Sequence, residues 1–189
     1  MAAHLSTSSF SIQLKWRQII LPLLLLILLI TTGTPTWAQN SIVSPNTTDR
    51  RIETLSPIDQ QFMAAQRAKV ETLANQLGQQ LTGVPERDLA TLKRILELGL
   101  IAPDDTLQLQ ALGVVLGDLF ATELNMNWVV YRDPAGRSRA LQYGASEVFL
   151  FPITMISRRW AVGHQRAVTD IFDTNVATTR AKLPGANWR

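Results

Sequence analysis

The 189-residue chain contains no cysteine, which excludes disulfides, a thiol nucleophile and every thiolate metal site. Histidine is scarce too, because only His4 and His164 are present. No histidine pair or carboxylate cluster has the spacing of a zinc site. Hydrophobic residues make up 46% of the chain and charged residues 17%, and this balance excludes disorder throughout. We therefore expect a folded domain without a metal or another cofactor.

Acidic residues are absent from the first eighteen positions, which hold two basic residues and precede the apolar run IILPLLLLILLI at 19–30. This run is shorter than the roughly 20 residues of a membrane-spanning helix. Together with the small Ala38, the pattern is typical of a secretory signal peptide over residues 1–38. We expect cleavage after Ala38 and a periplasmic or secreted mature protein. The alternative is an uncleaved anchor that holds the protein in the inner membrane through residues 19–30.

Loss of the signal peptide would remove Lys15 and Arg17, which leaves 16 of the 18 basic residues against 15 acidic ones. A nearly neutral protein is not expected to bind nucleic acid. The remaining charge is unevenly distributed, with 7 basic and 11 acidic residues over 39–131 but 9 basic and 4 acidic residues over 132–189. This asymmetry predicts either that the two halves pair across one domain or that the C-terminal half attracts an anionic partner.

A polar segment at residues 39–54 is expected to be a flexible lead-in. The next seventy residues carry the signals of three helices, because capping residues and prolines mark their starts and glycines follow two of their ends. The predicted helices cover residues 56–83, 85–99 and 104–124. The apolar face of the first is predicted to contain Phe62, Val70, Leu73, Leu77 and Leu81.

The third predicted helix is apolar nearly all round, which is typical of a buried central helix. Gly113, Gly117 and Ala121 recur every four residues within it. We expect this stripe of small residues to let another element approach closely, since glycine otherwise costs a helix interior about 1 kcal/mol. Asp118 is the one charged residue in the middle of this helix. It either faces a pocket or forms, with Thr122, a narrow stripe that faces solvent.

After residue 126 the composition changes to that of strands, with a turn signal at residues 133–136. We predict a three-stranded antiparallel meander at 127–131, 139–143 and 147–151, and two closing helices at 152–163 and 165–182. The predicted fold class is α+β, with N-terminal helices, the meander and two C-terminal helices in a single domain at 55–183, followed by a tail at 184–189.

Basic and aromatic residues of the hairpin and of the following helix form the candidate binding surface, which could hold an anion or a carbohydrate. The candidate binding residues are Asp118, Trp128, Arg132, Arg139, Ser157, Arg158 and Arg159. Two structural roles are the alternative explanation of the arginines. Cations complement the dipole at a helix C-terminus, and charged residues protect the edge of a sheet from pairing.

No residue is assigned as catalytic, because Ser157 and His164 lack a Gly-x-Ser-x-Gly sequence around the serine. We expect a non-enzymatic binding module of the cell envelope. Its partner would be an unknown envelope protein or an anionic ligand, and it would touch the membrane only through an uncleaved signal segment. The alternative function is a periplasmic hydrolase that uses Asp118 or the carboxylates of Glu123 and Glu147.

Three short motifs resemble one known family. They are Leu-Gly-Val-Val-Leu-Gly-Asp at 112–118, Trp-Val-Val at 128–130 before the turn at 133–136, and Phe-Leu-Phe-Pro-Ile-Thr-Met-Ile-Ser-Arg-Arg at 149–159. In this order they resemble the bacterial family called domain of unknown function 3806. The resemblance implies a family-like core at 107–180. It implies no cofactor and names no reaction.

Overall fold

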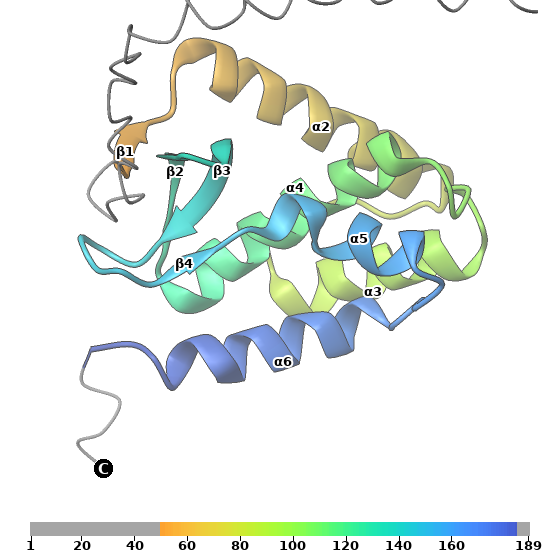
Figure 1. The fold of residues 1–189 in the computed structure, drawn as a ribbon. Coiled ribbons are helices and arrows are strands. Elements are labelled where there is room, and N and C mark those ends of the chain that lie inside the picture. The colour runs from red at the N-terminus through yellow and green to blue at the C-terminus, as the bar shows by residue number, and fades with distance from the viewer. Residues whose placement is uncertain (1–49, 185–189) are drawn as a thin grey trace, which may run out of the picture. The chain divides into compact units, whose positions relative to one another are not determined.

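The computed structural model describes residues 50–184, which lie within one compact unit. The strands are β1 (Arg51–Thr54), β2 (Asn127–Asp133), β3 (Gly136–Gln142) and β4 (Phe149–Leu150). The helices are α2 (Pro57–Gln76), α3 (Pro85–Glu97), α4 (Thr106–Leu124), α5 (Met155–Ala161) and α6 (Val168–Arg180), with the short 3₁₀ helix η1 (Pro152–Thr154) before α5. The predicted α+β class is confirmed (Figure 1). The predicted signal peptide, the start of the lead-in and the end of the tail lie outside the described residues.

All four strands form one antiparallel sheet in the order β1-β2-β3-β4. The sheet has one strand more than predicted, because Arg51–Thr54 pairs with β2. The prediction that the flexible lead-in extends to residue 54 is therefore wrong at its end. Every residue of β1 is exposed, so this edge strand carries no apolar alternation that would reveal it in the sequence. Backbone hydrogen bonds to β2 hold it in place.

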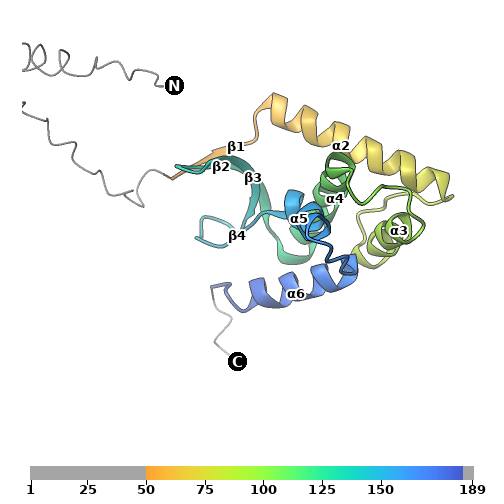
Figure 2. The ribbon, with the colours of Figure 1, turned by 45° about the vertical axis from the view of Figure 1, so that its right-hand side comes forward.

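Helix α4 runs through the middle of the domain, with α2 on one side and α6 on the other (Figures 1 and 2). It is long and apolar enough to span a membrane. The structure explains its composition differently, since α2, α3, α5, α6 and η1 all pack against it. Its Leu112, Leu116 and Phe120 are fully buried, and the Phe120 ring stacks on Phe172 of α6 with centroids 5.0 Å apart. The predicted buried central helix is confirmed.

Two glycines of α4 create its closest contacts. A Cβ atom on Gly113 would lie 2.7 Å from the carbonyl carbon of Ile153 in η1, and one on Gly117 would lie 2.6 Å from Cη2 of the Trp128 ring and closer still to Cζ2. Neither space admits a side chain. The predicted close approach is therefore confirmed, and it brings η1 and β2 against α4 at successive turns.

Helix α2 differs from its prediction in length and in phase. It ends at Gln76, and Gly78 follows with a φ of 67°, a left-handed conformation that glycine adopts without strain. Its buried face consists of Asp59, Met63, Gln66, Val70 and Ala74. Four of the five residues predicted for this face are instead half-buried, since only Val70 is fully covered. The apolar pattern failed here because two polar side chains, Asp59 and Gln66, occupy the buried stripe.

Candidate functional site

Asp118 lies at the contact of three elements. Its carboxylate accepts hydrogen bonds from Arg67 of α2 at both oxygens, with Nε to Oδ2 and Nη2 to Oδ1 distances of 2.7 Å. The indole nitrogen of Trp128 on β2 donates to the same carboxylate at 2.9 Å. The Trp128 ring also packs against Gly117, the residue before Asp118. These contacts connect α2, α4 and β2, and the carboxylate raises the pKa of Arg67 because it hydrogen-bonds the charged guanidinium.

The side chain of Asp118 is 32% exposed, so it is neither a fully buried acid nor a free one. It borders a cavity of about 370 Å³ between α2, the loop at 81–83 and α4. This agrees in part with each of the two alternatives for Asp118, because the residue lines a cavity and also reaches solvent. Both carboxylate oxygens are occupied by partners within the domain, which is the pattern of a structural ion pair.

A second carboxylate, Asp59, is only 1% exposed and binds two arginines of β3. Arg137 Nη2 lies 2.5 Å from Oδ2, and Arg139 Nε lies 2.9 Å from Oδ1. The backbone and hydroxyl groups of Ser56 donate to the same carboxylate. Arg139 also lies over the Phe62 ring, 4.1 Å from its centroid. These bonds, led by the one from Arg137, hold the pKa of Asp59 far below its usual range, although burial acts in the opposite direction.

Arg132, another predicted binding residue, pairs with Glu53 across β1 and β2 at 3.3 Å. The hairpin arginines therefore bind acidic residues of the N-terminal half, and Arg180 of α6 likewise pairs with Glu123. The charge asymmetry of the sequence thus serves to pair the two halves within one domain, as one of its two interpretations predicted.

The three carboxylates of the hydrolase alternative are held by three different arginines. Asp118 binds Arg67, Glu123 binds Arg180 and Glu147 binds Arg50. The structure also contains, over residues 50–184, no group of three or more histidine and acidic side chains that could hold a metal ion.

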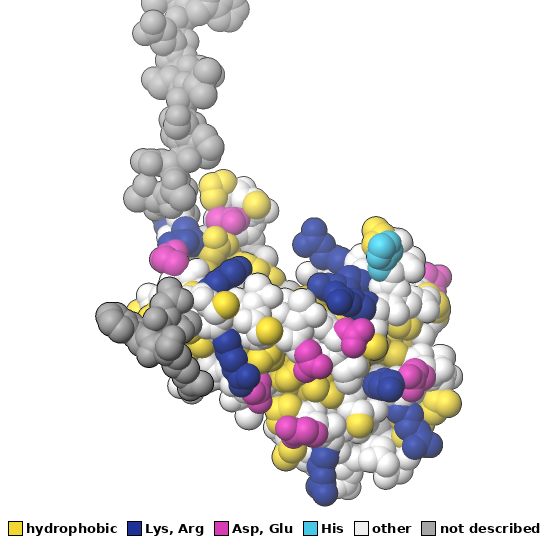
Figure 3. Space-filling model, turned by 90° about the horizontal axis from the view of Figure 1, so that it is seen from below, with side chains coloured by type: hydrophobic (Ala, Val, Ile, Leu, Met, Phe, Trp, Pro, Cys, Tyr) yellow, Lys and Arg dark blue, Asp and Glu magenta, His cyan; other side chains and the backbone are white. Residues whose placement is uncertain are grey.

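Arg158 and Arg159 lie in the last turn of α5, and Arg166 lies just before α6. Within residues 50–184, no carboxylate forms an ion pair with any of the three. Arg159 uses one donor on the backbone oxygen of Met155, at 2.6 Å, which leaves the remaining N–H groups of its guanidinium available. Figure 3 shows basic side chains gathered next to the described histidine, His164.

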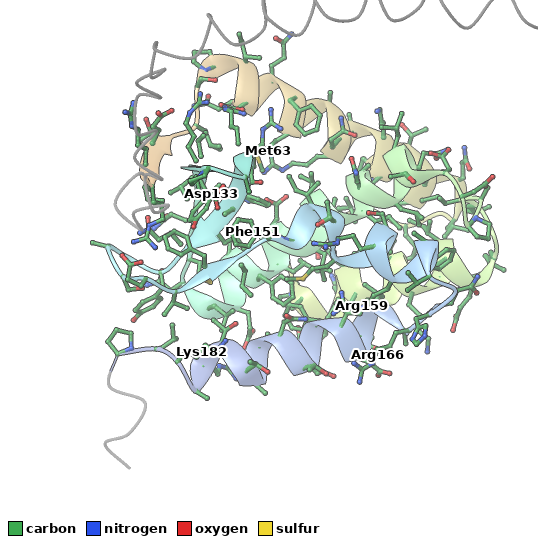
Figure 4. The ribbon with its side chains drawn as sticks, in the orientation of Figure 1. Met63, Asp133, Phe151, Arg159, Arg166 and Lys182 are labelled. Atoms are coloured by element: carbon green, nitrogen blue, oxygen red, sulfur yellow. The ribbon has the colours of Figure 1, made fainter. Side chains whose placement is uncertain are left out.

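Two hollows meet at Arg159. One, of about 360 Å³, is lined by Phe149, Leu150, Phe151, Thr154, Met155, Arg158 and Arg159. The other, of about 390 Å³, is lined by Arg159, His164, Gln165 and Arg166. Neither lining contains a carboxylate. Figure 4 shows Phe151 just before η1, Arg159 on α5 and Arg166 just before α6.

The predicted binding residues thus fall into separate groups. Asp118 and Trp128 are joined, Arg139 belongs to the Asp59 cluster, and Arg132 pairs with β1. Ser157 is only 4% exposed and faces the interior, so its predicted place on a binding surface is wrong. Its position one turn from the end of a helix that packs on α4 explains this burial. Arg158 and Arg159 remain as the predicted binding arginines that form no ion pair within residues 50–184.

Residues 88–172 match a family described as a domain of unknown function, DUF3806. The chain resembles this family over that stretch. The match contains the three motifs that predicted it and begins earlier than the core proposed from sequence. The DUF3806 stretch includes Asp118, Trp128, Arg158 and Arg159. It excludes α2, so Arg67, the partner of Asp118, and the carboxylate of Asp59 lie outside it.

A crystal structure of a protein from Bacteroides thetaiotaomicron VPI-5482, at 1.50 Å resolution, has a similar fold with a TM-score of 0.56. The two chains are 18% identical, and the match covers 66% of this chain and 48% of the other. The similarity therefore concerns the fold alone, and the present chain spans about half of that protein. No curated protein matches the chain.

Sequence reasoning missed His164 and Arg166 as neighbours of Arg159, and it missed the aromatic wall of the first hollow. The sequence predicts Phe149 and Phe151 only as parts of a strand and of the motif at 149–159. Their spacing of two residues is the sequence signal for a shared aromatic surface, because alternate residues of an extended segment lie on the same side.

Proposed function

We propose that this domain is a non-enzymatic binding module of the cell envelope and that it binds an anionic group at Arg158, Arg159 and Arg166. The observation that carries the proposal is the contrast in pairing. These three arginines have no carboxylate partner within the described residues, and they line two adjoining hollows that contain no carboxylate. Guanidinium groups that keep free donors in a concave surface are suited to carboxylate, phosphate or sulfate groups.

A binding role is favoured over hydrolysis by the state of the candidate carboxylates. A hydrolytic pair needs two carboxyl groups that converge on one bond. Asp118, Glu123 and Glu147 instead neutralise separate arginines. Each of these carboxylates is thus already bound to an arginine of the same domain.

Localisation in the envelope is supported by the N-terminal pattern of the sequence, a basic stretch, a short apolar run and a small residue at position 38. The test is expression of the full chain in a bacterial host, followed by cell fractionation and N-terminal sequencing. We expect a periplasmic protein that starts at Gln39. A full-length protein in the cytoplasm would refute export, and a full-length protein in the membrane would support the anchored alternative.

The binding test uses an immobilised generic polyanion, dextran sulfate, and purified protein from residue 39 onward. The variant Arg158→Gln with Arg159→Gln is compared with Arg87→Gln and Arg94→Gln, two exposed arginines of α3 that also lack an ion pair in the described residues. Both double variants lose the same charge. We expect about a tenfold loss of affinity for the first and little change for the second. Equal losses would show attraction by net charge alone and would refute the site.

A further inference from the structure

The hollow at the end of β4 has an aromatic wall that is fixed in position. Tyr131 of β2 meets both Phe149 and Phe151 edge to face, with ring centroids 5.1 and 5.3 Å apart. Phe151 nevertheless remains 39% exposed. An aromatic ring that is held in place yet open to solvent loses little conformational freedom when it is covered, so it is well suited to packing against an apolar group.

Arginine side chains border this apolar wall on one side. Arg158 and Arg159 line the same hollow as Phe149 and Phe151, and Arg159 continues into the second hollow with His164 and Arg166. The surface thus presents an apolar recess first and then a series of cationic groups. A ligand that fits both parts carries an apolar side chain beside several negative charges.

Resting on the function proposed above, we propose that the two hollows form one groove that binds an acidic peptide segment of a partner protein. One aromatic or large aliphatic side chain of the peptide occupies the recess between Phe149 and Phe151. Neighbouring carboxylates of the peptide pair with Arg158, Arg159 and Arg166. Phe, Tyr and Arg are the residue types enriched at the centres of protein interfaces.

The shape of the site favours a peptide over a lipid surface. Membrane-binding surfaces insert apolar side chains into the bilayer, whereas Phe149 and Phe151 line a recess that receives a side chain. Forked guanidinium groups also match carboxylates with two hydrogen bonds each. An extended peptide places alternate side chains on opposite sides, so a single apolar residue between acidic ones can enter the recess while its neighbours remain near the cations.

The test measures fluorescence anisotropy with three labelled peptides, Glu-Glu-Phe-Glu-Glu, Glu-Glu-Ala-Glu-Glu and Gln-Gln-Phe-Gln-Gln, and protein from residue 39 onward. We expect the first peptide to bind about ten times more tightly than either of the others, because it alone fits both parts of the groove. Equal affinities for the first two peptides would overturn the inference, since the recess would then make no contribution.

Two variants assign the effect to residues. Phe151→Ala should lower the affinity for the phenylalanine peptide to that of the alanine peptide and leave the alanine peptide unchanged. Arg158→Gln with Arg159→Gln should weaken both acidic peptides, whereas Arg87→Gln with Arg94→Gln should weaken neither. Far-ultraviolet circular dichroism confirms that each variant is folded. A Phe151→Ala protein that is folded and retains the preference for phenylalanine would refute the proposed recess.

Vesicles of phosphatidylcholine and phosphatidylglycerol in equal amounts separate this inference from the proposed function. Arginine-dependent binding to vesicles without binding to any peptide would refute the peptide groove and would support an anion-binding surface. Loss of the arginine dependence with peptides, vesicles and dextran sulfate alike would overturn both proposals.

Discussion

Two sets of arginines in this domain differ in their partners. Arg67 lies on α2 and Arg137 and Arg139 lie on β3, and each binds a carboxylate of the same domain. Arg158 and Arg159 at the end of α5, and Arg166 just before α6, have no such partner within residues 50–184. The first set connects α2 to α4 and to the sheet, whereas the second set lines the hollows at the surface. The difference shows that arginine alone does not mark a binding surface, and that pairing within the fold decides which arginines remain available.

The binding surface predicted from the sequence combined Arg139 of the first set with Arg158 and Arg159 of the second. The structure separates these residues. Trp128 illustrates the reason. It lies on the same face of β2 as Val130, turned toward α4 and away from Tyr131. Tyr131 belongs with Phe149 and Phe151 on the opposite face. Successive side chains of a strand point to opposite faces, which separates Trp128 from the other three aromatic residues. Ion pairing separates the arginines into two sets in a similar way.

The largest effect on stability is expected for Asp59→Ala. This change leaves the two arginines of β3 without their carboxylate, and we expect a loss of about 3 kcal/mol in the free energy of unfolding, measured by urea denaturation. The control is Asp105→Ala, which removes the acid that caps α4 through the amide of Gln108. It should cause a clearly smaller loss. Similar losses of unfolding free energy for both variants would mean that the ion pairs of Asp59 contribute no more stability than a helix cap does.

The second prediction concerns pH. The pKa of Asp59 is lowered in the folded state, so the unfolded chain binds a proton more readily than the folded one. The stabilisation from Asp59 is therefore complete at pH values well above its ordinary pKa of about 3.9 and is lost as the pH falls below that value. The difference in unfolding free energy between wild type and Asp59→Ala should be constant from pH 7 to about pH 5 and decrease in stronger acid. A difference that grows on acidification would contradict this sign.

A smaller effect is expected for Asp118→Ala. The Arg67–Asp118 pair is partly exposed, so solvent screens it, and we expect a loss of about 1 to 2 kcal/mol. A double-mutant cycle with Arg67→Gln tests the pair directly. A coupling free energy near zero between Arg67 and Asp118 would show that Asp118 stabilises the fold through Trp128 alone. A second cycle, with Asp118→Ala and Trp128→Phe, would then give the whole coupling free energy of Asp118.

The smallest effect on stability is expected for Arg158→Gln. The side chain is exposed, and within the described residues it forms neither a hydrogen bond nor an ion pair, so the unfolding free energy should change by less than about 0.5 kcal/mol. This result, together with the predicted loss of binding, would separate the two sets of arginines most clearly. A large loss of stability would place Arg158 with the structural set and remove the basis for the anionic site.

Most of the helices could be predicted because their ends depend on local chemistry. Ser56 caps α2 and exchanges hydrogen bonds with Asp59, and Asp105 accepts a bond from the amide of Gln108. The last predicted helix corresponds to α6, whose Val168, Ile171, Phe172 and Val176 are buried at helical spacing. Such features need only a few neighbouring residues, and so the sequence displays them.

The candidate site could be predicted only in part, because its decisive contacts join residues far apart in the chain. Arg67 and Asp118 are separated by 51 positions, and Asp59 and Arg139 by 80. Which arginine meets which carboxylate depends on how α2 lies across the sheet and α4, and no local pattern encodes that. Sequence reasoning therefore found Arg158 and Arg159 but could not distinguish them from arginines that are already paired.

The edge strand β1 also determines how the domain would respond to mechanical force. A pull on the chain at Arg50 acts first on the hydrogen bonds between β1 and β2. A pull along the strand would load all four residue pairs of this ladder at once, whereas a pull away from the sheet would break them in succession. The next attachment is Asp59, which fastens the start of α2 to Arg137 and Arg139 of β3. The strand and the ion cluster thus act in series as two points that resist tension on the N-terminal side.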